Sequence, residues 1–194
     1  MPQVSLRDLV AGVQSGRLIG FPTDTVPALA AQPTAAAAIY AAKQRSSQKP
    51  LILMGATPAD LWPFVQGNPA AQWIWERVAH QYWPGAITLV LPASDRLPKA
   101  VNPDNPTTIG LRVPNWPLAQ DILRQTGPLA TTSLNRSDQP PLEDLAAIAA
   151  EFPTVLTPTA ALWQLPPEGD RVPSTVAQWT GQGWSILRQG AIVL

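Results

Sequence analysis

The chain has 194 residues, with 13 cationic and 13 anionic side chains, so no net charge draws it towards nucleic acid or membranes. It contains no cysteine and one histidine, which excludes disulfides, thiolate metal sites, a cysteine nucleophile and histidine-rich metal centres. The 45% apolar content fits a globular protein, and we expect residues 1–194 to form a single domain. Neither a membrane-spanning run nor a signal peptide is recognisable, so the sequence predicts a cytoplasmic protein.

Apolar periodicity and turn signals predict alternating helices and strands along the chain. Ser5 begins a capping box before a first helix that ends at Gly16, and Thr34 is expected to cap an alanine-rich helix. Further helices are predicted at residues 58–65, 69–81, 117–125 and 142–151. Short apolar runs predict strands at residues 17–21, 51–54, 86–92, 107–114, 128–133, 154–157, 174–179, 184–188 and 191–194. This alternation indicates an α/β domain with a mixed sheet.

Polar and cationic side chains gather at the ends of these strands, where α/β proteins usually bind ligands. Residues 21–27 (FPTDTVP) present hydroxyls and a carboxylate, which fits either a ligand site or a simple polar turn. Lys43, Arg45 and Lys49 fit a phosphate clamp, whereas pairing with the helix dipole explains Lys43 but not Lys49. Residues 131–137 form a hydrogen-bonding cradle or a polar turn.

The strand-embedded Arg112 needs a buried partner unless it lies at an exposed edge. The segments at residues 21–30, 43–51, 83–91, 108–114, 128–141, 173–176 and 186–192 together contain only two acids, Asp24 and Asp138. Their cationic residues are Lys43, Arg45, Lys49, Arg112, Arg136 and Arg188. This imbalance predicts that a protein of zero net charge gathers positive charge in one cleft.

A series of motifs occurs in the order found in a known family, at residues 21–26, 43–51, 83–91, 109–114, 128–137, 173–176 and 186–192. From about residue 5 to 194, the chain resembles the YrdC/TsaC family of threonylcarbamoyl-AMP synthases. The resemblance implies a single YrdC-like domain, α/β in class, whose twisted mixed sheet is flanked by helices and encloses a concave cationic cavity.

The resemblance also implies synthesis of L-threonylcarbamoyladenylate and pyrophosphate from L-threonine, bicarbonate and ATP, with Mg²⁺ as the associated cation. The product would serve tRNA threonylcarbamoyl-transfer enzymes, so contact with tRNA is expected to be indirect or weak. Two anions, the N-carboxylated threonine and the triphosphate, would meet in this reaction. Such a meeting requires cations that neutralise and position both groups.

Site residues follow from the same resemblance. ATP contacts are assigned to Arg45, Lys49, Thr108, Ser133, Asn135 and Arg188, of which Arg45 and Lys49 are expected to act in catalysis. Threonine contacts are assigned to Thr23, Arg112 and Ser174, with Arg112 suited to a bidentate grip on the carboxylate. Lys43 is expected to contribute its charge, and no metal-ligating residue is implied.

The sequence departs from the family pattern at three positions. Pro27 stands where tyrosine is usual, Leu134 interrupts a Ser-Ala-Asn stretch, and Asp138 replaces the glycine of a Ser-Gly pair. These changes leave open a divergent relative that binds a nucleotide or another amino acid with weak or altered activity. An RNA-binding module that uses the concave face is a further alternative, which a steep salt dependence of RNA affinity would favour.

Overall fold

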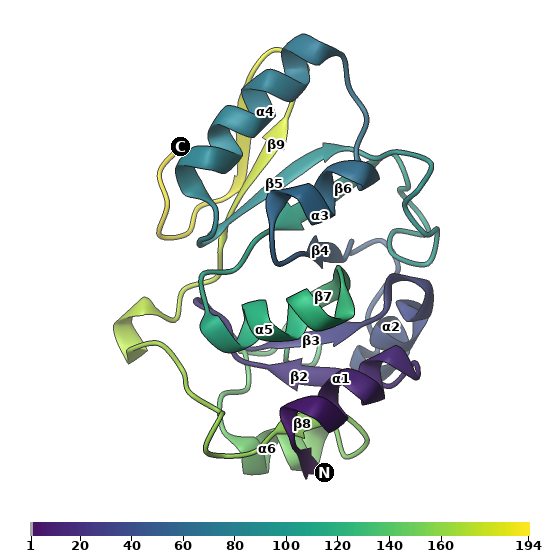
Figure 1. The fold of residues 1–194 in the computed structure, drawn as a ribbon, viewed down its shortest axis with the longest axis vertical. Coiled ribbons are helices and arrows are strands. Elements are labelled where there is room, and N and C mark those ends of the chain that lie inside the picture. Colours follow the sequence, from purple (N-terminus) through teal and green to yellow (C-terminus); the bar gives the residue numbers. More distant parts are fainter. Residues whose placement is uncertain (1) are drawn as a thin grey trace.

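The computed structural model describes residues 2–194, and one mixed sheet of eight strands organises it (Figure 1). The strand order across this sheet is β10-β9-β5-β6-β4-β7-β3-β2. Its strands are β2 (Ile19–Phe21), β3 (Ala28–Ala31), β4 (Ile52–Met54), β5 (Ile87–Pro92), β6 (Thr108–Arg112), β7 (Leu129–Ser133), β9 (Thr175–Trp179) and β10 (Trp184–Arg188). The β4–β6 and β5–β9 pairs are parallel, and the other neighbours are antiparallel. A second, two-stranded sheet pairs β1 (Gln3–Val4) with β8 (Thr157–Pro158).

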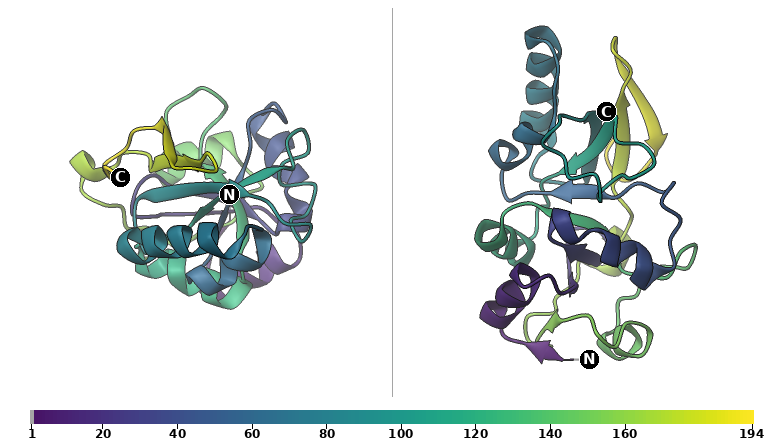
Figure 2. Two further views of the ribbon diagram at one scale, coloured as in Figure 1. Left: turned by 90° about the horizontal axis from the view of Figure 1, so that it is seen from above. Right: turned by 90° about the vertical axis from the view of Figure 1, so that its right-hand side faces the viewer.

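Helices lie on both sides of the large sheet. They are α1 (Leu6–Gln14), α2 (Ala37–Lys43), α3 (Pro58–Leu61), α4 (Pro69–Tyr82), α5 (Pro117–Thr126) and α6 (Leu145–Glu151), with 3₁₀ turns at Pro33–Ala35, Trp62–Phe64 and Glu168–Asp170. In the right-hand view of Figure 2, α1, α4 and α5 lie on one side of the sheet, while α2 and α6 lie towards the other. The mixed α/β class and the helix-flanked sheet are therefore as the sequence predicts.

Local signals set several element ends. The Ser5 hydroxyl accepts a hydrogen bond from the Asp8 amide at 3.2 Å and caps α1, and Gly16 follows this helix with a φ of 87°. Asn68 caps α4 in the same way, since its Oδ1 accepts the Ala71 amide at 2.8 Å. Such caps satisfy amide groups that have no partner within the helix. Apolar side chains on the inner faces of these helices then pack against the sheet.

Some predicted elements are wrong in detail. Thr34 caps no helix, because Pro33–Ala35 forms a 3₁₀ turn and α2 begins at Ala37 without a side-chain cap. Residues 191–194 form no strand, and the Ile192 carbonyl instead accepts a hydrogen bond from the Thr175 hydroxyl at 2.6 Å. The sequence does not predict β3, because its four buried residues, ALAA, show neither alternation nor β-branching.

Helix length and hydropathy also bear on membrane insertion. Across residues 2–194, none of the helices combines the length and apolar character that a membrane crossing requires.

Candidate functional site

A cavity of about 710 Å³ opens along the sheet and is bordered by the loops that follow α2, β5 and β7. Every predicted site residue except Thr23 lines it, namely Arg45, Lys49, Thr108, Arg112, Ser133, Asn135, Ser174 and Arg188. These residues come from segments spread over most of the chain, and the fold brings them to one place. The cavity is large enough for a ligand well above the size of a free amino acid.

The charge in the cavity wall has one sign. Arg45, Lys49, Arg112 and Arg188 line it, and among the side chains that the structure describes no aspartate or glutamate does so. Burial lowers the pKa of Arg188, yet an arginine in a protein keeps its charge at neutral pH. Four cations gathered in the wall of one cavity suit an anionic ligand.

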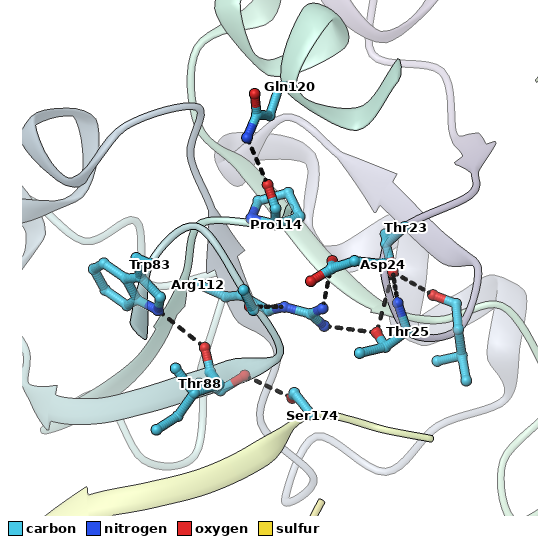
Figure 3. Close-up of polar contacts among 12 residues, drawn as sticks. Thr23, Asp24, Thr25, Trp83, Thr88, Arg112, Pro114, Gln120 and Ser174 are labelled. Carbon is cyan, nitrogen blue, oxygen red and sulfur yellow. Dashed lines mark hydrogen bonds and ion pairs between the residues drawn. The ribbon is translucent and has the colours of Figure 1, made fainter. Parts of the chain in front are cut away.

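Arg112 lies at one end of the cavity, where it is held by three acceptors (Figure 3). Its Nη2 donates to Asp24 Oδ1 at 2.7 Å, its Nη1 to Thr25 Oγ1 at 2.8 Å, and its Nε to the Gly85 carbonyl at 3.2 Å. The Arg112 side chain is only 4% exposed. Burial lowers the pKa of Arg112, while the Asp24 charge opposes that shift. These bonds use three of the five N–H groups of the guanidinium.

Thr23 supports this arrangement from behind the cavity wall. It is fully buried, and its Oγ1 donates to the Val26 carbonyl at 2.8 Å and accepts the Thr25 amide at 3.1 Å. These bonds fix the turn that carries Asp24 and Thr25 towards Arg112. Thr23 is therefore not brought into the cavity wall with the other predicted site residues, and its hydroxyl bonds within its own turn.

Ser174 and Arg188 form the wall on the β9–β10 side. Arg188 Nε donates to the Ser174 carbonyl at 3.0 Å, and its Nη2 donates to Ser174 Oγ at 3.2 Å. Ser174 Oγ also shares a hydrogen bond with Thr88 Oγ1 at 2.9 Å. A register shift in β10 between Ile186 and Arg188 precedes this contact, and such irregularities commonly redirect side chains near functional sites.

Gly190 allows the chain after Arg188 to pack closely against the backbone of residues 173–175. A methyl group there would lie 2.4 Å from the Pro173 carbonyl oxygen and 2.5 Å from the Thr175 nitrogen. We expect Gly190→Ala to lower the free energy of unfolding by about 1–3 kcal/mol, because backbone atoms must move to accept it. Gly183→Ala is the matched control, since nothing lies within 4 Å of its added methyl. Urea unfolding of both variants measures the difference, and equal losses would contradict the assigned packing.

Lys43 does not line the cavity, but it contacts two residues that do. It is 1% exposed, and its Nζ donates to the Ser133 carbonyl and to Asn135 Oδ1, the latter at 2.7 Å. Burial, together with the charges of Arg45 and Lys49, lowers the pKa of Lys43 to about 7. Ser133 Oγ donates to the same Asn135 oxygen at 2.7 Å. Lys43 thus ties the end of β7 to the loop that follows it.

The loop after α2 presents Arg45 and Lys49. Arg45 Nε donates to the Lys49 carbonyl at 3.0 Å and its Nη2 to the Pro50 carbonyl at 3.2 Å, so Arg45 shapes the loop as well as charging it. The Lys49 ammonium contacts both carboxylate oxygens of Asp138, at 2.6 and 2.8 Å. Both side chains of this ion pair are substantially exposed.

Arg136 and Asn102 also differ from what the sequence predicts. Arg136, one of the cations expected in the cleft, instead donates to Glu151 and to the Ala42 carbonyl and lies 5.0 Å from the Phe152 ring centroid. Asn102 is absent from the predicted site, although it lines the cavity and is 3% exposed. Its side chain accepts the Leu51 amide at 3.0 Å and donates to the Thr108 carbonyl at 2.9 Å. A lone asparagine in a loop carries no sequence signal for such a bridge.

The chain is similar to known proteins along most of its length. Threonylcarbamoyl-AMP synthase of Homo sapiens is 34% identical over 139 residues, which cover 70% of this chain and 48% of that protein. Threonylcarbamoyl-AMP synthase of Stenotrophomonas maltophilia (strain K279a) is 34% identical over 147 residues, which cover 73% of this chain and 77% of that protein. This chain therefore spans about half the length of the human relative.

Solved structures agree with the sequence matches. P. abyssi Sua5 complexed with L-threonine has a TM-score of 0.82 and 27% identity, covering 95% of this chain and 54% of that chain. E. coli YciO, at 23% identity, shares the fold with a TM-score of 0.78 and covers 98% of this chain and 93% of that chain. The family model Sua5_yciO_yrdC, described as telomere recombination, matches residues 12–190. This match spans most of the sequence, and the chain belongs to the Sua5/YciO/YrdC family.

Proposed function

We propose that the chain is a threonylcarbamoyl-AMP synthase, which makes L-threonylcarbamoyladenylate and pyrophosphate from L-threonine, bicarbonate and ATP. One observation carries this proposal: Arg45, Lys49, Arg112 and Arg188 line a single cavity of about 710 Å³. The names of the human and S. maltophilia relatives and the L-threonine complex of P. abyssi Sua5 support the same activity. The cations lie in the wall of a cavity, which suits a compact polyanion better than an extended nucleic acid backbone.

The proposed reaction joins two anions. The amine of L-threonine combines with bicarbonate to give an N-carboxylate and water. An oxygen of this carboxylate then forms a bond to the α-phosphorus of ATP, and the bond from that phosphorus to the bridging oxygen of the β-phosphate breaks to release pyrophosphate. The chain contributes charge neutralisation and alignment in this mechanism, and no covalent protein intermediate is required.

We assign the residues that line the cavity to the two substrates. Arg112 is proposed to bind the threonine carboxylate, and Ser174 is proposed to contact the same substrate. Arg45, Lys49 and Arg188 are proposed to bind the phosphates, and Thr108, Ser133 and Asn135 add hydroxyl and amide groups to the cavity wall. Pro27 and Ala28 also line the cavity. Because Pro27 stands where the family pattern carries tyrosine, this part of the cavity wall lacks the tyrosine ring and hydroxyl.

Mg²⁺ is proposed to arrive with the nucleotide. Protein sites for Mg²⁺ usually include one or two carboxylates besides the substrate phosphates. The described part of the chain supplies no carboxylate to the cavity wall and holds no cluster of three metal-ligating side chains. The residues therefore do not fit a resident metal site, and none of the proposed steps passes through a metal bound by the protein. The adenylate product is proposed to pass to tRNA threonylcarbamoyl-transfer enzymes.

Lys49→Ala tests the nucleotide end of the cavity. We expect its affinity for ATP to fall at least tenfold, because a hydrogen bond to a charged group contributes about 1.5–3 kcal/mol. The fold should be little affected, since the Lys49 side chain is 45% exposed. Lys99→Ala is the matched control, because Lys99 is exposed and does not line the cavity. Calorimetric titration with ATP makes the comparison, and equal affinities for the two variants would remove Lys49 from the site.

A further inference from the structure

We propose that Asp138 competes with phosphate for Lys49, so that a polyphosphate ligand must displace the Asp138 carboxylate in order to bind. This inference rests on the proposed nucleotide function and adds a residue that tunes access to the same site. Asp138 lies in the loop after β7, which contributes Asn135 and Gln139 to the cavity wall.

The contact between the two residues resembles a phosphate contact. Both carboxylate oxygens of Asp138 reach the Lys49 ammonium, at 2.6 and 2.8 Å. Hydrogen bonding to Lys49 and the Lys49 charge lower the pKa of Asp138, so its carboxylate is ionised at neutral pH. The ammonium therefore already has an anionic partner before any ligand enters.

The position of the pair places it at the opening of the cavity. Lys49 and Gln139 both line the cavity, and Asp138 directly precedes Gln139 in the loop after β7. The pair thereby links the loop after α2 to the loop after β7. On its other side, the loop after α2 is linked to residues 102–107 by a hydrogen bond of 2.6 Å from Ser47 Oγ to Asp104 Oδ2.

The exposure of the pair makes displacement feasible. The side chains of Lys49 and Asp138 are 45% and 78% exposed, and ion pairs so open to water are weak because the solvent screens both charges. A triphosphate carries more charge than one carboxylate and can therefore take over Lys49. The displaced Asp138 carboxylate then lies near the phosphates and repels them, and both effects lower the affinity.

Asp138→Asn separates this role from a general effect of charge. Asparagine keeps the size of the side chain and tolerates the positive φ of 65° at this position. We expect ATP and inorganic tripolyphosphate to bind Asp138→Asn about three- to fivefold more tightly than they bind the natural chain at low salt. The gain should shrink as KCl is raised, because salt screens exposed charges.

Asp104→Asn is the matched control. It also removes one negative charge next to the loop after α2, but the partner of Asp104 is the neutral hydroxyl of Ser47. Its affinity for both ligands should equal that of the natural chain. In a Lys49→Met background, Asp138→Asn should lose the part of its gain that comes from competition for Lys49, and should keep only the part that comes from the lost repulsion. Calorimetric titration of all variants, with melting temperatures to confirm folding, provides these comparisons.

The outcomes distinguish the inference from the function on which it rests. A gain in Asp138→Asn that depends on Lys49 and is absent in Asp104→Asn supports the competition. Tight binding of ATP to the natural chain with no gain in Asp138→Asn, or an equal gain in Asp104→Asn, overturns the inference but leaves the proposed function standing. Failure of every variant to bind either ligand overturns both.

Discussion

Replacing Arg112 with methionine is expected to lower the free energy of unfolding by about 3 kcal/mol or more. The Arg112 side chain is 4% exposed and that of Asp24 is 11% exposed, so the substitution leaves a carboxylate with little access to water and no countercharge. Thr25 and the Gly85 carbonyl also lose a donor. Urea unfolding at pH 7 measures the loss. Because the same guanidinium is proposed to bind threonine, the folded variant should also lose threonine affinity.

Two comparisons isolate this buried pair. Arg124 forms an ion pair with Asp121 at 2.6 Å, but both side chains are more than half exposed, and Arg124→Ala should cost less than about 1 kcal/mol. Adding Asp24→Asn to Arg112→Met should recover part of the loss, because the unpaired charge is removed. A loss in Arg112→Met no larger than that in Arg124→Ala would show that the buried network does not stabilise the fold.

The second large effect is a pH dependence of stability that Lys43 causes. Its pKa falls from 10.5 in the unfolded chain to about 7 in the folded protein. Between these values the unfolded chain holds a proton that the folded protein has released, so the free energy of unfolding rises with pH. The slope reaches about 1.4 kcal/mol per pH unit at most. Below pH 7 both states are protonated, and the cost of burying the charge is present in full.

Lys43→Met removes this dependence. Relative to the variant, the natural chain should gain about 2 kcal/mol of stability between pH 7 and pH 9. Urea unfolding of both proteins at pH 6, 7.5 and 9 gives the difference, from which the contributions of other titrating groups cancel. Lys99→Met, at an exposed position, should differ from the natural chain by a constant amount. Parallel pH profiles for the natural chain and Lys43→Met would show that the Lys43 charge is not costly to bury.

The long elements and most of the cavity wall can be predicted from the sequence. The continuous apolar run of β5 and the capped helices α1 and α4 carry strong local signals, and the structure shows them close to their predicted limits. Arg112 is predicted to need a partner because a charge inside an apolar strand costs free energy when it is unpaired. Local periodicity does not indicate which loops meet in the folded protein. The assignment of residues from distant segments to one site therefore depends on the family resemblance that the ordered motifs carry.

The remaining features depend on contacts that only the folded chain creates. Thr23 and Thr25 occur in the same short motif, yet one hydroxyl fixes the turn while the other reaches Arg112, and their sequence neighbours do not distinguish them. Leu134, which departs from the family pattern, is fully buried in the main core and does not line the cavity. Asp138 meets Lys49 across 89 positions of sequence, so their pairing requires the structure.

We propose that N-carboxylated threonine is joined to the adenylate of ATP in this cavity. The most direct test is to incubate the protein with ATP, Mg²⁺, bicarbonate and L-threonine, and to follow pyrophosphate release together with the mass of the nucleotide product. We expect pyrophosphate release that requires both L-threonine and bicarbonate, with L-threonylcarbamoyladenylate as the product and a strong loss of rate in Lys49→Ala. Binding of ATP without any release of pyrophosphate when all substrates are present would contradict this proposal.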